Sequence, residues 1–128
     1  MAYNILIVDD SGTMRQVIGK ALRMSGLELG SLLEAENGRR GLEILREQWV
    51  DLVFSDLNMP VMGGMEMLDE MKKDESLREI PVVVISTEGS SARIGELQGK
   101  GIDGFLRKPF LPDALKKTIT SILGADHE

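Results

Sequence analysis

Short apolar runs alternate with longer segments of helical period along the whole chain. Five runs, at residues 5–8, 32–33, 52–54, 82–85 and 105–106, have the character of strands. After each run, apolar residues recur three and four positions apart, as on one face of a helix. The residues that define these faces are Met14, Val17, Ile18, Ala21 and Leu22, then Leu42, Ile44 and Leu45, then Met65, Leu68 and Met71, then Ile94 and Leu97, and finally Leu111, Ala114, Leu115 and Ile122.

Five strand and helix repeats predict a parallel sheet with helices on both faces, because parallel neighbours need crossover connections and these are usually helical. Runs 5–8, 52–54 and 82–85 are unbroken, as in strands covered on both faces. Run 32–33 has polar neighbours and run 105–106 is short, so we place them at the edges. The prediction is an α/β fold with a doubly wound five-stranded parallel sheet in the order 2-1-3-4-5.

The composition narrows the possible functions. With 128 residues, 42% hydrophobic and 28% charged, the chain has the make-up of a single globular domain, residues 1–128. Its 21 acidic and 15 basic residues give a net charge of −6, which argues against nucleic acid as a partner. Cysteine is absent and the one histidine, His127, is penultimate, so we expect no thiolate or histidine catalysis.

No apolar stretch in the sequence approaches the length of a membrane span, and the N-terminus lacks the pattern of a signal peptide. We therefore expect no membrane insertion and a cytoplasmic location.

Polar residues follow the predicted strands where they end, and ligands of doubly wound sheets bind at that edge. Asp9 and Asp10 follow the first strand, Asp56 the third, Ser86 the fourth and Lys108 the fifth. Clustered carboxylates require a compensating cation, and oxygen ligands favour Mg²⁺, with Mn²⁺ as the alternative. Such a site suggests phosphate chemistry in which a carboxylate attacks phosphorus, while a lysine and a hydroxyl bind the phosphoryl oxygens.

Each of these residues also has a purely structural interpretation. Asp9 and Asp10 could cap the helix that follows, and Asp56 could be a turn former. Lys108 and Ser86 could be ordinary loop groups. The functional interpretation depends on the coincidence that four strand ends each supply a group that the chemistry needs.

Four motifs of the chain resemble the receiver domain of two-component response regulators. They are Ile-Leu-Ile-Val-Asp-Asp at 5–10, Asp-Leu-Asn-Met-Pro-Val-Met-Gly-Gly at 56–64, Pro-Val-Val-Val-Ile-Ser at 81–86 and Lys-Pro-Phe at 108–110. Their order and spacing are most similar to the stand-alone chemotaxis, or CheY-like, type, over about residues 4–123. The resemblance implies a flavodoxin-like three-layer sandwich. Because the chain stops directly after the fifth helix, we expect no output domain.

The resemblance implies roles for the residues at the strand ends. Asp56 would accept the phosphoryl group, Asp10 would bind Mg²⁺ directly and Asp9 would bind it through water. The backbone carbonyl of Asn58 would be a further metal ligand. Lys108 would contact the phosphoryl oxygens, and the 108–109 peptide bond is expected to be cis.

The resemblance also implies residues that change conformation on phosphorylation and residues that set the rate of dephosphorylation. Ser86 would move toward the phosphate while Phe105 rotates inward, although a plain core aromatic on an edge strand is the alternative for Phe105. Asn58 and Glu88 hold the positions that tune dephosphorylation, and this pair predicts a short-lived phosphoryl group.

The implied partners are proteins. A sensor histidine kinase or a His-phosphotransferase would donate the phosphoryl group, and the face made by the fourth helix, fifth strand and fifth helix would bind a target, with the flagellar motor switch as one candidate.

We expect a monomer with no activity on an external substrate. A receiver from another phosphorelay and a pseudo-receiver that only binds proteins remain alternatives. A small-molecule phosphatase would have Asp-x-Asp where residues 56–58 read Asp-Leu-Asn, and a pseudo-receiver would lack Asp10, Asp56 or Lys108.

Two further features have open interpretations. Gly95, Gly99 and Gly101 lie in or beside the fourth helical segment, where they indicate either a soft switching helix or close packing on the sheet. Trp49 precedes the third strand and is predicted to be a packing residue.

Overall fold

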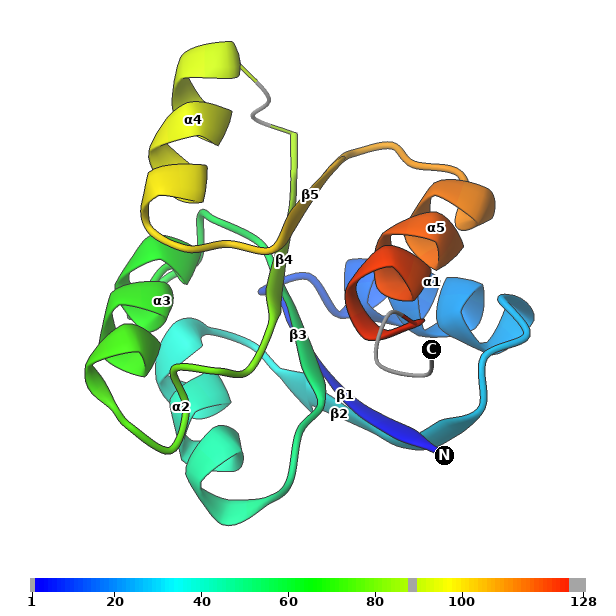
Figure 1. Ribbon diagram of the computed structural model, residues 1–128, viewed down its shortest axis with the longest axis horizontal. Helices are drawn as coiled ribbons and strands as arrows, with labels where there is room; N and C mark the ends of the chain where they lie inside the picture. Colours follow the sequence, from blue (N-terminus) through cyan, green and yellow to red (C-terminus); the bar gives the residue numbers. More distant parts are fainter. Residues whose placement is uncertain (1, 88–89, 125–128) are drawn as a thin grey trace.

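The computed structural model describes residues 2–87 and 90–124, in which strands and helices alternate along the chain (Figure 1). The strands are β1 (Tyr3–Val8), β2 (Leu29–Ala35), β3 (Leu52–Ser55), β4 (Val82–Ser86) and β5 (Gly104–Arg107). The helices are α1 (Gly12–Met24), α2 (Gly38–Glu47), α3 (Gly64–Lys73), α4 (Ser91–Gly99) and α5 (Pro112–Leu123). All strand pairs are parallel and the order is β2-β1-β3-β4-β5, so the predicted fold and edge strands are confirmed.

The sheet separates two apolar cores, because successive side chains of a strand point to opposite faces. Ile5 and Ile7 of β1 join the core under α1 and α5, whereas Leu6 and Val8 join the core under α2 and α3. Figure 1 shows α1 and α5 on one side of the sheet and α2, α3 and α4 on the other. The three-layer sandwich follows from this division.

Helix α4 is anchored to the sheet by little apolar surface. Leu97 is its one buried residue, and it packs in a small cluster with Leu57 and Val84. A Cβ atom added at Gly95 or Gly99 would meet no atom within 4 Å, so close packing does not explain these two glycines. Gly101 has a φ of +98°, in the left-handed region that favours glycine.

Three apolar residues are more exposed than the sequence pattern predicts. Val17 is 48% exposed because it lies beside the buried stripe of α1, and Leu111 is 74% exposed because it is the N-cap of α5 and precedes the helical face. Trp49 is 75% exposed in the connection between α2 and β3, where its indole N–H donates to Asp51 Oδ1 at 2.9 Å. The predictions that Leu111 and Trp49 are packing residues are therefore wrong.

Within the described residues, no helix is long and apolar enough to cross a membrane.

Candidate functional site

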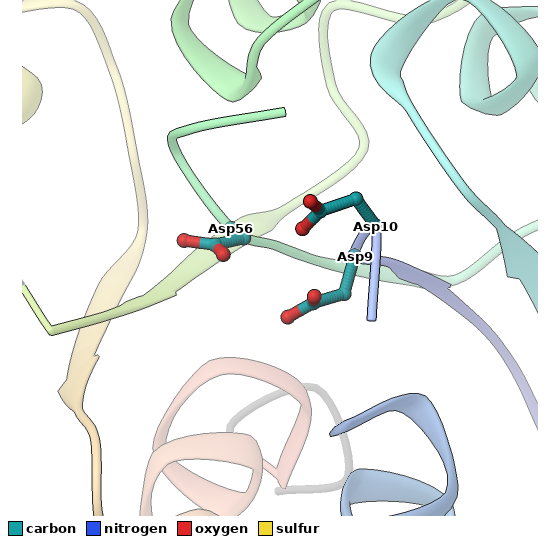
Figure 2. Close-up of side chains that lie close together, drawn as sticks. All are labelled: Asp9, Asp10 and Asp56. Carbon is teal, nitrogen blue, oxygen red and sulfur yellow. The ribbon is translucent and has the colours of Figure 1, made fainter. Parts of the chain in front are cut away.

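Three carboxylates meet where β1 and β3 end. Asp9 follows Val8, Asp56 follows Ser55, and Val8 and Ser55 are paired in the sheet, so the two aspartates leave neighbouring strands at the same level. Asp10 is next in the chain. One carboxylate oxygen from each of the three aspartates lies within 4.8 Å of the others, and Figure 2 shows these carboxylates grouped at the strand ends.

Asp9 is held in place by hydrogen bonds and is almost inaccessible, with 1% exposure. Its Oδ1 accepts a hydrogen bond from the backbone N–H of Ser11 at 2.9 Å. The N-cap of α1 is Ser11, whose hydroxyl oxygen accepts from the N–H of Met14 at 3.1 Å. The interpretation of Asp9 and Asp10 as the residues that cap α1 is therefore wrong.

Asp56 is fixed by backbone contacts on both sides. Its N–H donates to the carbonyl of Val8 at 3.0 Å, and its Oδ1 accepts from the N–H of Leu57 at 2.7 Å. Gly64 begins α3 directly against the Asp56 carbonyl, where a Cβ atom would clash with the carbonyl oxygen. Only glycine leaves room for this approach. The Asp56 side chain remains 15% exposed, so a ligand can reach it.

Lys108 lies between two of the carboxylates. Its Nζ is 3.0 Å from Asp9 Oδ2 and 3.2 Å from Asp56 Oδ2, and its side chain is 12% exposed. Desolvation by burial acts to lower the pKa of Lys108, but the hydrogen bond to Asp9 and the charge of Asp56 outweigh it and raise the pKa. The interpretation of Lys108 as an ordinary loop cation is wrong. The 108–109 peptide bond is cis, as expected.

The remaining predicted residues surround this cluster. Ser86 ends β4 with 1% exposure, and its carbonyl accepts from the N–H of Lys108 at 2.9 Å. Phe105 lies on β5 opposite Val84 and is half-buried against the cluster that contains Leu97. Asn58 is exposed in the connection between β3 and α3. Glu88 and His127 lie outside the described residues.

Arg15 and Gly64 also shape the site, although the sequence pattern does not single them out. The side chain of Arg15 donates from Nη1 to the backbone carbonyl of Asp9 and pairs through Nε with Glu34 Oε1 at 2.8 Å. Gly64 was noticed only as part of a motif. A basic residue one turn into a helix that begins beside an acidic pair is a weak signal, because its contact on β2 lies 19 residues away.

The donor set fits a hard divalent cation. All three acidic groups offer oxygen ligands, and Asp10 is exposed so that waters can complete the coordination. Lys108 pairs with Asp9 and Asp56, which leaves Asp10 without a contact to this ammonium. This combination is typical of an Mg²⁺ site that also receives phosphate oxygens.

Comparisons with known proteins agree with this geometry. A family model for the response regulator receiver domain matches residues 5–120. Chemotaxis protein CheY1 of Helicobacter pylori is 35% identical over 123 residues, which cover 95% of this chain and 98% of that protein. Chemotaxis protein CheY-3 of Vibrio cholerae is 36% identical over 118 residues, covering 92% of this chain and 89% of that protein. The solved structure of Vibrio cholerae CheY4 superimposes with a TM-score of 0.86 at 32% identity and covers 96% of this chain and 100% of its own.

The match to the family model shows that this chain belongs to the response regulator receiver domains of two-component signalling, and the doubly wound sheet with an acidic cluster at its carboxyl edge agrees with that family. Its curated relatives are CheY chemotaxis proteins, so it is a receiver of the CheY type. The family consists of signalling receivers and not of enzymes for an external substrate.

Proposed function

We propose that this chain is a phosphorylation-activated response regulator in which Asp56 accepts a phosphoryl group while Mg²⁺ is bound. The observation that carries the proposal is the position of the Asp56 carboxylate, which is accessible, close to Asp9 and Asp10, and 3.2 Å from the Lys108 ammonium. A sensor histidine kinase or a His-phosphotransferase supplies the phosphoryl group from a phosphohistidine. The transfer takes place in the cytoplasm.

The chemistry is an in-line displacement at phosphorus. A carboxylate oxygen of Asp56 forms the new P–O bond as the P–N bond of the phosphohistidine breaks, and the imidazole leaves with the bonding pair. Bound Mg²⁺ supplies charge neutralisation for the phosphoryl oxygens. Lys108 transfers its contact from the Asp56 carboxylate to a phosphoryl oxygen, and the Ser86 hydroxyl donates another hydrogen bond to the phosphoryl group.

The direct test uses acetyl phosphate with Mg²⁺, followed by intact mass measurement. We expect the wild type to gain one phosphoryl group and Asp56→Asn to gain none. A matched control is Asp69→Asn, because Asp69 is a carboxylate on α3 whose partner is Lys100 at 3.2 Å rather than the cluster. If Asp56→Asn were phosphorylated like the wild type, or the wild type gained nothing, the proposal would be wrong.

Phosphorylation then shifts a two-state equilibrium toward the form that binds a target protein. In this proposal Ser86 moves toward the phosphoryl group and Phe105 turns inward, so that the face of α4, β5 and α5 changes. Support comes from the half-buried position of Phe105 beside Leu97, the one buried residue of α4. The protein acts as a monomer, and the flagellar motor switch is the first target to test because the relatives are named chemotaxis proteins.

The lifetime of the phosphoryl group distinguishes a rapid chemotaxis-type regulator from a storage step in a phosphorelay. Asn58 and Glu88 occupy the tuning positions, and their combination favours rapid hydrolysis. Phosphate release from phosphorylated protein with Mg²⁺ present measures this rate. A half-life of many hours would favour the alternative, a receiver in another phosphorelay.

A further inference from the structure

We infer that Arg15 is a positioning residue for the acidic cluster: it orients the Asp9–Asp10 peptide unit and thereby sets the affinity for Mg²⁺. The inference rests on the proposed function, because it assumes that these carboxylates bind the ion. The contacts of the Arg15 side chain with the described residues are with Glu34 and the backbone carbonyl of Asp9, and neither involves a carboxylate of the cluster.

Arg15 connects three elements. It lies in the first turn of α1, where its own N–H donates to the carbonyl of Ser11 at 3.0 Å. Its Nη1 donates to the Asp9 carbonyl at the end of β1, and its Nε pairs at 2.8 Å with Glu34 Oε1 on β2. The Arg15 side chain is 20% exposed, so this guanidinium is largely enclosed between the helix and the sheet.

The contact between Arg15 and the Asp9 carbonyl also affects the orientation of the next residue, Asp10. On the other side of that residue, the Asp9 N–H donates to the carbonyl of Ala35 on β2 at 3.0 Å. The carbonyl that Arg15 binds belongs to the planar peptide unit that leads into Asp10. Asp10 is exposed, and no hydrogen bond from the described residues holds its carboxylate, although Figure 2 shows this carboxylate turned toward the other two. The direction of this peptide unit is therefore what places the Asp10 carboxylate in the cluster.

Glu34 fixes the guanidinium from the opposite side. The planar fork of arginine can donate from Nε and Nη1 in two fixed directions, whereas a lysine ammonium is a point charge that cannot hold both acceptors in the same geometry. Glu34 is 52% exposed, so the ion pair itself contributes little to stability. We infer that Glu34 instead orients the Arg15 guanidinium.

Whether a variant of Arg15 strengthens or weakens Mg²⁺ binding distinguishes a positioning role from a purely electrostatic one. If Arg15 acted only as a positive charge near the cluster, then Arg15→Gln would strengthen Mg²⁺ binding and Arg15→Lys would leave it unchanged. If Arg15 positions the Asp9–Asp10 unit, both variants weaken binding. Outer contacts that orient metal ligands typically change affinity about tenfold or more.

The experiment is isothermal titration calorimetry of the full chain with MgCl₂, without any phosphodonor. We expect Arg15→Gln and Arg15→Lys to weaken binding about tenfold, and Glu34→Gln to weaken it by a smaller factor. The matched control is Arg23→Gln, which removes the same side chain from the last turn of α1, and it should keep wild-type affinity. Urea unfolding without Mg²⁺ verifies that each variant is folded. If Arg15→Gln does not fold, the Mg²⁺ affinity of Arg15→Lys tests the inference.

Wild-type affinity in Arg15→Lys, or tighter binding in Arg15→Gln, would overturn the inference. Loss of affinity in Arg23→Gln equal to that in Arg15→Gln would also overturn it, since the effect would then not depend on the contact with the Asp9 carbonyl. Failure of the proposed function looks different. In that case the wild type itself would not bind Mg²⁺, or Asp56→Asn would bind it as tightly as the wild type.

Discussion

Lys108 brings a positive charge into the acidic cluster. Its ammonium is within 3.2 Å of both Asp9 and Asp56, and its pKa is raised. A group whose folded pKa is raised stabilises the fold below its unfolded pKa, and that contribution disappears as the pH rises through the folded pKa. The unfolded pKa of lysine is about 10.4, so the contribution is complete at neutral pH.

Replacement of Lys108 by methionine should therefore destabilise the metal-free protein in a pH-dependent way. We expect a loss of about 1–3 kcal/mol at pH 8, because two charge-assisted hydrogen bonds disappear and the carboxylates keep their mutual repulsion. The difference between wild type and Lys108→Met should shrink above about pH 10.4. Urea unfolding at both pH values measures it, and a difference that grew with pH would contradict the assignment.

Trp49 is the only tryptophan of the chain, and its position determines what fluorescence can report. It is 75% exposed just before β3 begins, at the edge of the sheet opposite to the acidic cluster. We expect an emission spectrum typical of exposed indole, easy quenching by acrylamide, and almost no response to Mg²⁺ or to phosphorylation of Asp56. A strong response to Mg²⁺ in the wild type would show that the two edges of the sheet are coupled.

At the scale of elements, α4 is expected to be the least stable helix of the described chain. Its Gly95 and Gly99 face open space. Replacing an exposed glycine inside a helix by alanine gains about 1 kcal/mol of helix stability, and the gain is smaller at Gly99 because this residue ends the helix. Gly95→Ala and Gly99→Ala should therefore slow amide hydrogen exchange in α4. Unchanged exchange in α4 in both variants would contradict this explanation.

The matched control for these substitutions is Gly41→Ala in α2. There a Cβ atom would lie 3.0 Å from Met67 Sδ and 3.2 Å from Val8 Cγ2, both in the core. The helix propensity gain is then offset by overpacking, so we expect no stabilisation or a loss of stability. The same chemical change should thus stabilise α4 and should not stabilise α2.

The sequence pattern predicted the elements well where they bury a continuous apolar run. β1, β3 and β4 are covered on both faces, and their unbroken apolar runs predict them as strands. Exposure at element ends was less predictable. Leu111 continues the apolar spacing of α5, yet it precedes the first helical residue, and a spacing rule does not locate that boundary.

At the scale of the whole molecule, folding assembles the acidic cluster from distant parts of the chain. Lys108 lies 99 residues from Asp9 and 52 from Asp56. The unfolded chain therefore has no cluster, and an ion that binds only the folded form stabilises it. Mg²⁺ at about 100 times its dissociation constant should raise the unfolding free energy by about 2.7 kcal/mol.

The variant Asp10→Asn separates repulsion from metal binding. Without Mg²⁺ it should be as stable as the wild type or more stable, because one of three clustered charges is gone. Addition of Mg²⁺ should raise the unfolding free energy of Asp10→Asn much less than that of the wild type. Thermal unfolding with and without the ion measures both effects, and an equal Mg²⁺ gain in the two proteins would exclude Asp10 as a ligand.

The fold class, the strand order and the set of polar groups at the carboxyl edge could be predicted from the sequence, because they depend on local periodicity and on the continuity of apolar runs. The sequence also indicated Asp9, Asp10, Asp56 and Lys108 as one cluster, since parallel strands end at the same edge. Which side chains contact one another became visible only in the folded structure. The Lys108 contacts, the contact of Arg15 with the Asp9 carbonyl, the exposure of Trp49 and the open space beside Gly95 all depend on neighbours that packing brings from elsewhere in the chain.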